Sequence, residues 1–524
     1  MRKKRVLVVG GGSAGMSCVD RLISNGDEFD VTLIDSVNRC GGQAFSIGID
    51  ENRYGCSWLN QGVQGGSPIF HHTFRMFRKQ GYQVTPVKLQ ISFGKDQYFW
   101  TNVFPTKLIG KHRDEIKKFH RLLKLMSYLK IFFLLIPIRI LLKICLFSND
   151  FINYLILPTV ALFLGTGNAT PLVPSIILER LLNCPTFGMW HPPDDESLAS
   201  NLSSMVVFPN LTEFYTDWQK DLEKRGVKVR LSTELIEVIR RDKHGVQVKL
   251  KSRLSHDTPV KANMSSLDEH TDETIEEFDQ MVLTILPDKA KTILGKNARW
   301  MERWILGWVK FADDVTVTHT DTNYMEKYYT NHYHSSQAVE NLNGRDERGR
   351  CLFGKTHFKP MYYIKEYQSN PQKLQMSFDC SNYQSQFPES LHLSSHIFQT
   401  IFLNKKDSSI WTKDEISKEK ILREDWWHQI CHSWTHYLFV VPFIWLINGR
   451  NSTIYAGSWT LVNAHEVASI SGLAAACRLG ADYPEDLLND GFALLCFRLF
   501  LLLSHGKWFS TEKNKTRIND PFEI

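Results

Sequence analysis

The sequence of 524 residues lacks an apolar run long enough to cross a membrane as a helix. Its most apolar stretches are residues 131–144, which contain Arg139 and Lys143, and residues 492–503, which contain Arg498. No window reaches the ~18 consecutive apolar residues that a transmembrane helix needs. We therefore expect no segment that spans a bilayer.

Cysteine motifs are also missing. The chain has 10 cysteines, but no two form a CxxC pair and none combines with histidine at zinc spacing. We predict no metal site, and we interpret the cysteines as reduced, mostly buried thiols of an intracellular protein. The basic residues 1–5 look like the start of a signal peptide, but the apolar run behind them ends at residue 9. That run is too short for a signal peptide, so we do not expect secretion.

A strong net charge is absent as well. The 62 basic and 56 acidic residues give a net charge of +6, which is too small to argue for a nucleic-acid partner. Hydrophobic residues make up 43% and charged residues 23% of the chain, as in an ordinary globular protein. The length predicts two or three domains.

The most informative segment lies in the first 35 residues. Residues 5–9 form an aliphatic run, residues 10–15 read GGGSAG, and a helical pattern continues to Ile23. A second apolar run at residues 31–34 ends in Asp35. This order of strand, glycine turn, helix, strand and acid predicts a dinucleotide-binding unit. A glycine-rich turn in some other α/β unit is the alternative.

Each glycine of this fingerprint, and the acid that follows it, has an expected physical role. We expect Gly10 to make the tight turn, Gly12 to let the backbone approach a pyrophosphate, and Gly15 to let helix and strand pack closely. The pyrophosphate would lie at the positive end of the helix. Asp35 comes 20 residues after Gly15, where an acid accepts hydrogen bonds from ribose hydroxyls.

Three further glycine-rich segments need interpretation. Residues 39–43 (RCGGQ) and 55–66 lie close together in the sequence, which indicates either backbone packed against a flat or charged ligand or plain turns. Residues 165–170 (GTGNAT) lack a third glycine and a surrounding βαβ frame. We interpret them as a turn, which leaves no second nucleotide-binding domain.

Residues 112–165 combine basic side chains with leucines and aromatics. This composition suits helices at a membrane interface. Long buried helices of a substrate domain explain it equally well. The apolar residues 492–503, which are also too short to span a bilayer, favour membrane contact.

The rest of the chain predicts strands at residues 227–231, a hairpin of residues 235–239 and 245–250, and a buried strand at residues 278–285. We interpret the polar residues 252–277 as an exposed insertion, and expect a short helix from Pro287. Near the C-terminus, a strand and glycine turn at residues 453–460 precede a helix of small residues. The start of that helix can face an electron-rich ligand, or the helix can simply close the sheet.

These segments together resemble the flavin-containing amine oxidase superfamily, which includes monoamine oxidases, protoporphyrinogen oxidase and phytoene desaturases. Within it the chain is most similar to the NAD/FAD-binding, amine-oxidase-like oxidoreductases. The resemblance is weakest in residues 76–225. It implies an α/β fold with a Rossmann-type FAD-binding domain that is split in the sequence (1–75, 226–290 and 445–485). An α+β substrate domain with membrane-interfacial helices (76–225 and 291–444) is inserted, and an apolar, basic C-terminal tail (486–524) follows.

The resemblance also implies which residues hold FAD. Asp35 stands where the family more often has glutamate, Ile236 matches the hairpin residue that contacts adenine, and Trp459 departs from a position that is usually small or acidic. The expected cofactor-binding residues are Gly10, Gly12, Ser13, Ala14, Gly15, Asp35, Gly41, Gly42, Gln43, Ile236, Gly457, Ser458, Glu466 and Val467.

The expected function is that of an FAD-dependent oxidoreductase which removes a hydride from a lipophilic substrate, as a peripheral protein at an intracellular membrane surface. A soluble amine oxidase, a flavin-dependent double-bond isomerase and an inactive FAD-binding protein are the alternatives. No catalytic residue is assigned, because isolated aromatic and histidine side chains are more often structural. The candidates considered were Trp426, Trp427, Tyr437, His428, His432, His436 and His465.

Overall fold

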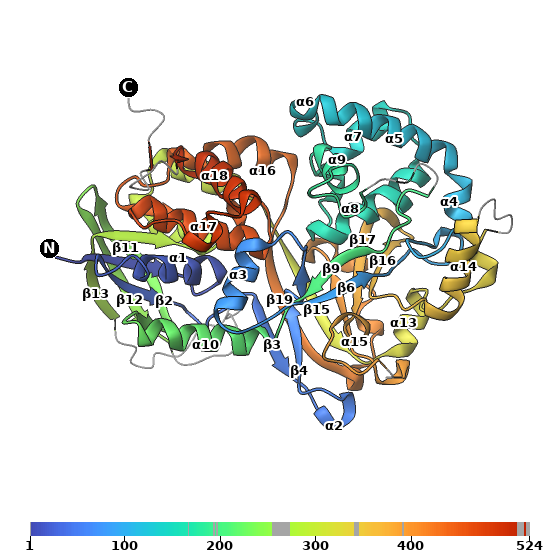
Figure 1. The fold of residues 1–524 in the computed structure, drawn as a ribbon, viewed down its shortest axis with the longest axis horizontal. Coiled ribbons are helices and arrows are strands. Elements are labelled where there is room, and N and C mark those ends of the chain that lie inside the picture. Colours follow the sequence, from blue (N-terminus) through green and yellow to red (C-terminus); the bar gives the residue numbers. More distant parts are fainter. Residues whose placement is uncertain are drawn as a thin grey trace.

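The computed structural model describes residues 2–165, 167–191, 194, 197–253, 273–339, 345–389, 392–510 and 518–519. Two lobes lie side by side (Figure 1). One lobe contains the N-terminus, and the other carries the helices of residues 107–182 (Figure 1).

The first lobe is built on a five-stranded parallel sheet with the order β10-β2-β1-β14-β20. Its strands come from three distant parts of the chain, as a split domain requires. Val6, Leu7 and Val8 of β1 are fully buried because helices or strands cover both faces of the sheet. The strands are β1 (Lys4–Val9), β2 (Phe29–Ile34), β10 (Lys228–Arg230), β14 (Gln280–Leu283) and β20 (Thr453–Tyr455).

Three helices cover one face of this sheet: α1 (Ser13–Ile23), α10 (Leu211–Lys224) and α17 (His465–Leu479). Phe214, Tyr215 and Trp218 of α10 belong to the same buried cluster as Val6 and Val8. Helix α10 therefore belongs to the nucleotide-binding lobe. This corrects the prediction that residues 76–225, which include α10, belong to the substrate domain. The sequence shows that α10 has an aromatic face, but not which sheet this face packs against.

The other face of the parallel sheet packs against the antiparallel strands β11 (Thr233–Asp242), β12 (Gly245–Ser252) and β13 (Glu273–Phe278). The predicted hairpin is present. Residues 273–278, expected to belong to an exposed insertion or to the next strand, pair with β12 instead. The centre of that insertion lies outside the described residues. Helices α11 (Pro287–Leu294) and α12 (Trp300–Trp308) complete this side.

A seven-stranded sheet with the order β19-β15-β18-β17-β16-β7-β8 forms the base of the second lobe. Its strands are β7 (Ile91–Phe93), β8 (Trp100–Thr101), β15 (Phe311–His319), β16 (Tyr362–Tyr367), β17 (Asn370–Asp379), β18 (Phe398–Phe402) and β19 (Ile421–Ile430). Four helices lie between or after strands β15 to β19 in the sequence: α13 (Thr322–Tyr328), α14 (Arg345–His357), α15 (Cys380–Tyr383) and α16 (Trp434–Phe439).

Short helices cover that sheet and stand highest in the second lobe (Figure 1). They are α4 (Lys107–Lys111), α5 (Arg113–Tyr128), α6 (Lys130–Leu134), α7 (Ile138–Ile144), a π-helix (Phe151–Ile156), α8 (Leu157–Leu164) and α9 (Ile176–Leu182). Helix α5 buries Ile116, Phe119, Leu123 and Met126, a spacing that gives it one apolar face. None of the helices within the described residues has the length and apolar character to cross a membrane.

Smaller elements join the lobes. The hairpin of β3 (Ala44–Gly48) and β4 (Trp58–Gly62) carries α2 (Glu51–Tyr54) between its strands, and α3 (His71–Lys79) follows. A three-stranded sheet of β5 (Gly65–Gly66), β9 (Ser203–Val207) and β6 (Thr85–Leu89) lies beyond it.

The segment expected to be an apolar, basic C-terminal tail begins with a helix. Helix α18 (Gly491–His505) packs on α17 through Leu494, Phe497 and Leu501. Asp490 caps this helix by accepting from the Ala493 amide. The pair β21 (Trp508–Phe509) and β22 (Ile518–Asn519) follows, and the remainder of residues 511–524 lies outside the described part of the chain.

Candidate dinucleotide-binding site

The turn after β1 has the geometry that the sequence predicts. Gly10 has a φ of +106°, which a residue with a side chain adopts only with strain. A Cβ added to Gly15 would lie 1.9 Å from the Gly10 carbonyl oxygen, so only glycine allows α1 to pack this closely. The Thr284 hydroxyl lies 2.8 Å from the carbonyl oxygens of both Val9 and Gly10, and braces the turn from β14. Sequence reasoning did not identify this threonine.

The first turn of α1 is open to an anion. Its N-cap residue, Gly12, has no side chain, no side-chain hydrogen bond caps the helix, and the first turn contains no acidic residue. The amides at such a helix end need a partner, and together with the helix dipole they favour a phosphate. Ser13 and Ala14, two of the predicted residues, supply amides of this turn.

The second glycine loop meets the first, although the sequence left open whether it was a plain turn. The Gly41 amide donates to the Gly11 carbonyl oxygen at 2.9 Å. A Cβ on Gly42 would lie 3.3 Å from the Gly12 Cα. The backbones of the two loops are therefore in contact at the start of α1. Gln43, in contrast, has an exposed side chain.

Asp35 lies beside the same loops. Its Oδ2 accepts from the Gly11 amide at 2.6 Å, and its Oδ1 accepts from the Val37 amide at 3.0 Å. Burial raises the pKa of this carboxyl, while the hydrogen bonds from these amides and the charge of Arg39 oppose the rise. Each carboxylate oxygen can accept more than one hydrogen bond, so the carboxylate can also bind ribose hydroxyls.

The predicted glycine turn near the C-terminus, at residues 453–460, also lies near the Gly10 turn. A Cβ on Gly457 would lie 3.9 Å from the carbonyl oxygen of Thr284, the residue that braces the Gly10 turn. Ser458 follows and its hydroxyl bonds to Asn463 at 3.0 Å. Helix α17 then starts at His465 without a side-chain cap. Two uncapped helix ends, those of α1 and α17, therefore belong to neighbouring helices.

Helices α1 and α17 touch along their backbones. A Cβ on Gly472 would lie 2.0 Å from the Ala14 carbonyl oxygen, and the Ser13 and Ser469 hydroxyls are 2.8 Å apart. The small residues that the sequence shows in α17 are therefore required by contact with α1.

The side chains at the start of α17 have structural partners. Glu466 accepts from the His72 and Thr73 amides and contacts His72 Nδ1 at 2.7 Å, so it caps α3. Burial raises the pKa of Glu466, but His72 and these amides outweigh that effect and lower it overall. His465 contacts the Tyr215 hydroxyl at 2.6 Å, and burial lowers its pKa to about 4. Only the backbone amides of this turn, including that of Val467, can face a ligand.

Ile236 lies farther along β11, at a bulge between Leu235 and Glu237. The strand begins beside the predicted ribose-binding acid, because the Thr233 amide donates to the Asp35 carbonyl oxygen at 2.8 Å. The proposed contact of Ile236 with adenine stays a prediction, as do the other cofactor-binding assignments.

Three of the aromatic and histidine candidates, Trp427, His428 and His432, have hydrogen-bond partners in the structure. Trp427 Nε1 donates to Thr316, and His428 pairs with Asp313 and Asp288. His432 Nε2 accepts from the Asn463 amide at 3.1 Å, in the turn that leads into α17. Burial lowers the pKa of His432 to about 3 and that of His436 to about 4.

A buried carboxyl on β15 is a candidate acid or base that the sequence did not indicate. Asp314 is 2% exposed and accepts from the Asn404 amide at 2.6 Å. Burial raises its pKa from 3.8 to about 7, and the charge of Asp313 adds to the rise. By strand alternation Asp314 shares a sheet face with Thr316 and Thr318. A carboxyl with this pKa can exchange a proton near neutral pH.

A buried network of amide side chains lies at the same face. Gln61 Nε2 is 2.9 Å from Thr318 Oγ1 and 2.7 Å from Asp425 Oδ2, and Gln399 joins it. This network ties β4 to the seven-stranded sheet. Its members come from four strands that are far apart in the sequence, so the sequence alone did not indicate that they meet.

The donor set fits a dinucleotide. Uncapped amides suit phosphates, Asp35 suits ribose, and the adjoining start of α17 suits an electron-rich ring. Among the described residues no group of three or more histidine, cysteine or acidic side chains could hold a metal ion.

Comparisons with known proteins agree with this geometry. Residues 8–79 match the NAD(P)-binding Rossmann-like domain. No curated protein sequence matches the chain.

Several solved structures share the fold over nearly their whole length. A protein described as a protoporphyrinogen oxidase, from Exiguobacterium sp. 255-15, has a TM-score of 0.57 and 13% identity, covering 91% of this chain and 99% of its own. A fatty acid isomerase from P. acnes that produces CLA has a TM-score of 0.56 and 14% identity, with coverages of 90% and 97%. A putrescine oxidase bound to putrescine has a TM-score of 0.56 and 11% identity, with coverages of 92% and 100%. The chain therefore shares the fold of these three proteins and has a Rossmann-like dinucleotide-binding unit at its N-terminal end.

Proposed function

We propose that the chain is an FAD-dependent oxidoreductase that acts on a lipophilic substrate at a membrane surface. The observation that carries the choice of FAD is that two neighbouring helices, α1 behind the Gly10 turn and α17 behind the Gly457 turn, both begin without a side-chain cap. A nicotinamide dinucleotide alone would give the second helix end no ligand.

The chain's own groups have distinct roles in this proposal. The amides of α1 bind the pyrophosphate, and Asp35 orients the ribose. The amides at the start of α17 stabilise negative charge on the ring system. A bound flavin would accept one hydride, which carries both electrons of the oxidation. The substrate would lose that hydride to the flavin and a proton to water, and gain a double bond.

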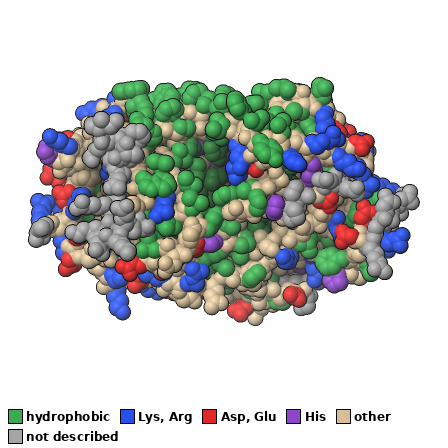
Figure 2. All heavy atoms as spheres, turned by 45° about the horizontal axis from the view of Figure 1, so that its top comes forward, with side chains coloured by type: hydrophobic (Ala, Val, Ile, Leu, Met, Phe, Trp, Pro, Cys, Tyr) green, Lys and Arg blue, Asp and Glu red, His purple; other side chains and the backbone are tan. Residues whose placement is uncertain are grey.

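An exposed apolar ridge supports the membrane part of the proposal. Hydrophobic side chains gather on the face formed by the tops of the two lobes, around a hollow between them (Figure 2). Ile131 is 79% exposed and Phe132 is 66% exposed, both on α6. Other large exposed apolar residues of this ridge are Leu125, Tyr128, Leu129, Leu135, Ile140, Ile144, Leu146, Leu495, Leu499 and Leu502. Contiguous apolar surface of this kind marks an interaction site.

The charge of the ridge matches an anionic lipid surface. Residues 117–147 contain seven Lys or Arg residues and no Asp or Glu. Lys117, Arg121, Lys124, Lys130 and Lys143 are exposed. Apolar and basic side chains on one short-helix surface favour the interface of a bilayer.

A flavin-dependent double-bond isomerase is the second candidate. The fatty acid isomerase from P. acnes has the same fold, and its substrate is lipophilic. An amine oxidase is the third, since the putrescine oxidase also shares the fold.

Anaerobic reduction separates these candidates. The FAD-loaded protein is mixed with a total lipid extract or with a panel of amines that includes putrescine, and flavin absorbance is followed. We expect the lipid extract to bleach the flavin and the amines to leave it oxidised. Bleaching by amines alone would contradict the proposal. Lipid isomers that form without lasting bleaching would favour the isomerase.

A further inference from the structure

The end of helix α7 combines a backbone conformation that suits glycine with an exposed leucine. Leu146 follows the last turn of α7 and has a φ of +55°, in the left-handed region. Its amide donates to the Lys143 carbonyl oxygen at 3.0 Å, and the Phe147 amide donates to the Leu142 carbonyl oxygen at 3.1 Å. This pair of hydrogen bonds is a Schellman motif, whose left-handed position favours glycine. A leucine there strains the backbone.

Other helices of the chain follow that preference. The left-handed residue at the helix end is Gly55 for α2, Gly165 for α8, Gly480 for α17 and Gly506 for α18. Leu146 gains little from packing in return, because it is 83% exposed. Folding therefore does not explain a leucine at this position.

Leu146 continues an exposed apolar strip along α7. Ile144 is 69% exposed, and Ile140, one turn earlier on the same side of the helix, is 50% exposed. We refer to Ile140, Ile144 and Leu146 as the α7 tip. Residues 111–150 around it contain nine Lys or Arg residues and three Asp or Glu residues. An apolar tip within a basic segment fits an anionic bilayer, where the acyl chains lie below the phosphates.

Two acidic side chains beside the α7 tip have partners of their own. Glu115 accepts from the Ser148 amide at 2.7 Å, and Asp150 pairs with Lys111 at 3.3 Å. These contacts offset part of the negative charge that an anionic lipid would repel. The lipid therefore meets mainly lysine and arginine side chains around the tip.

The main chain at Leu146 has its hydrogen bonds within the protein. Besides the two amides of the Schellman motif, the Cys145 amide donates to the Leu141 carbonyl oxygen at 2.9 Å. The ammonium group of Lys118 donates to the Leu146 carbonyl oxygen at 3.0 Å. Backbone groups that already have partners enter lipid at a much lower cost than groups that lose their water.

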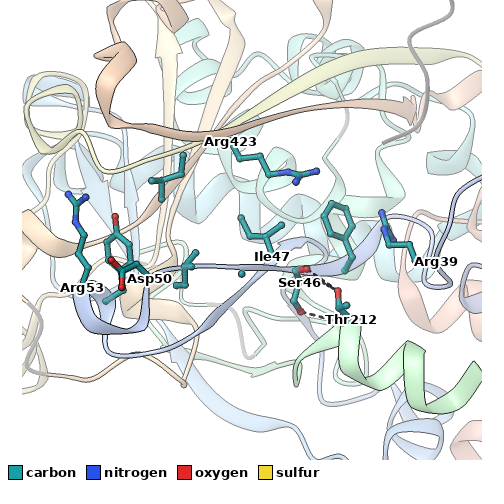
Figure 3. A pocket seen from close by; sticks show the side chains of 12 residues that line it. Arg39, Ser46, Ile47, Asp50, Arg53, Thr212 and Arg423 are labelled. Atoms are coloured by element: carbon teal, nitrogen blue, oxygen red, sulfur yellow. Dashed lines mark hydrogen bonds between the residues drawn. The ribbon is translucent and has the colours of Figure 1, made fainter. Parts of the chain in front are cut away.

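A cavity with a charged lining lies on the opposite side of the molecule. It has a volume of about 590 Å³ and lies between β3, the start of α10 and β19. Its walls carry Arg39, Arg53, Arg423 and Asp50 (Figure 3). The β3–α2 segment that lines it is on the other side of the molecule from α6 and α7 (Figure 1). With the α7 tip on a bilayer, this charged surface therefore stays in water, where ionised groups are most stable.

We propose that Leu146 inserts its side chain among the acyl chains of an anionic bilayer when the α7 tip lies on the membrane. This insertion depends on the membrane contact of the proposed function, and it is the part of that contact that one residue supplies. Moving the leucine side chain out of water is favourable and offsets the strain of its left-handed backbone. A glycine at this position would relieve the strain and lose the insertion.

Vesicle flotation and urea unfolding of the full-length protein test the proposal together. The vesicles contain phosphatidylcholine and phosphatidylserine. Leu146→Asn is the decisive variant, because asparagine tolerates the left-handed region but is polar. We expect it to bind the vesicles about tenfold more weakly than wild type and to unfold at the same or a higher urea concentration. Leu146→Gly should behave in the same way, and Leu146→Met, which stays apolar, should bind like wild type.

Leu352→Asn, the same substitution at an exposed leucine of α14, is the control and should leave vesicle binding unchanged. Binding that Leu146→Asn and Leu146→Gly both leave unaltered would overturn the insertion but not the membrane contact. Weaker binding together with a lower urea midpoint in both variants would show that Leu146 supports the fold instead, and would also overturn the proposal. A wild-type protein that does not bind the vesicles would contradict the membrane part of the proposed function, and the insertion with it.

Discussion

Single residues decide how the predicted nucleotide site is held together. Thr284 is 274 residues from Gly10 in the sequence, yet its hydroxyl is within hydrogen-bond distance of that glycine's carbonyl oxygen. Gly457 in turn lies beside Thr284. One threonine, directly after β14, therefore connects the two glycine turns on either side of it.

At the same scale, Asp314 should make the stability of the protein fall with pH. Its native pKa is about 7, against 3.8 for an ordinary aspartate, because it is buried. The native state thus holds a proton that the unfolded chain has lost between these pH values. Unfolding releases that proton, so the free energy of unfolding falls as the pH rises through this window. Asp314→Asn should abolish that part of the fall.

The measurement is chemical denaturation at pH 5 and at pH 8. The asparagine variant should gain stability relative to wild type at pH 8, by a few kcal/mol at most, and should gain clearly less at pH 5, where only part of the fall has occurred. Asp414→Asn, at an exposed carboxyl, is the control and should show no such difference. Equal effects of Asp314→Asn at the two pH values would show that the carboxyl titrates normally.

Among the elements, helices α1 and α17 are in close contact, and this contact is sensitive to side-chain size. Gly472→Ala places a methyl group 2.0 Å from the Ala14 carbonyl oxygen. The helices must move apart, which we expect to lower the free energy of unfolding by roughly 1–3 kcal/mol. The gain in helix propensity, about 1 kcal/mol, opposes this only in part.

Gly491→Ala is the matched control, because the added methyl group at the start of α18 has no atom within 4 Å. Its effect should stay within about 0.5 kcal/mol. Thermal or urea unfolding of both variants makes the comparison. A Gly472→Ala protein as stable as the control would show that the two helix backbones do not touch as described.

Elements with a local signature could be predicted from the sequence, and those defined by distant partners could not. The turn between β1 and α1 follows from glycine spacing, and the β11–β12 hairpin follows from alternation. Helix α10 looks like any amphipathic helix, and nothing local says that Trp218 packs on the parallel sheet. Residues 273–277 are mostly acidic and exposed, so their pairing with β12, rather than an apolar pattern, makes them a strand.

In the predicted site, too, the sequence indicates local roles but not contacts with distant residues. Backbone roles such as that of Gly15 could be read from spacing, because a glycine is required wherever two backbones meet. Side-chain roles could not, since Glu466 faces α3 and its partner His72 is 394 residues away in the sequence. The burial that shifts the pKa of Asp314 likewise depends on the assembled sheet.

At the scale of the whole molecule, the apolar ridge predicts binding to anionic membranes. Replacing Ile131 and Phe132 together by aspartate removes two exposed apolar side chains and adds charges that anionic lipid repels. Vesicle binding should become roughly a hundredfold weaker, measured by flotation with vesicles that contain phosphatidylserine. Leu352→Asp, at an exposed residue of α14, is the control and should bind like wild type.

Salt and lipid charge distinguish the electrostatic from the apolar contribution to membrane binding. Binding to neutral vesicles should be weaker than to anionic ones, and added salt should reduce the difference, since residues 117–147 carry only positive charge. A protein that ignores both kinds of vesicle would contradict the membrane part of the proposed function, while leaving the nucleotide site untouched.

The central claim is that the two uncapped helix ends and the glycine loops hold a flavin. The most direct test is the visible absorbance of the purified protein after reconstitution with FAD and removal of excess cofactor, for wild type and for Gly12→Asp. That aspartate fits the space, since only the Gly42 Cα lies within 4 Å of its Cβ, and it caps α1. We predict about one flavin per wild-type chain and a folded but colourless variant. A colourless wild-type protein, or a variant that binds FAD equally well, would contradict the account.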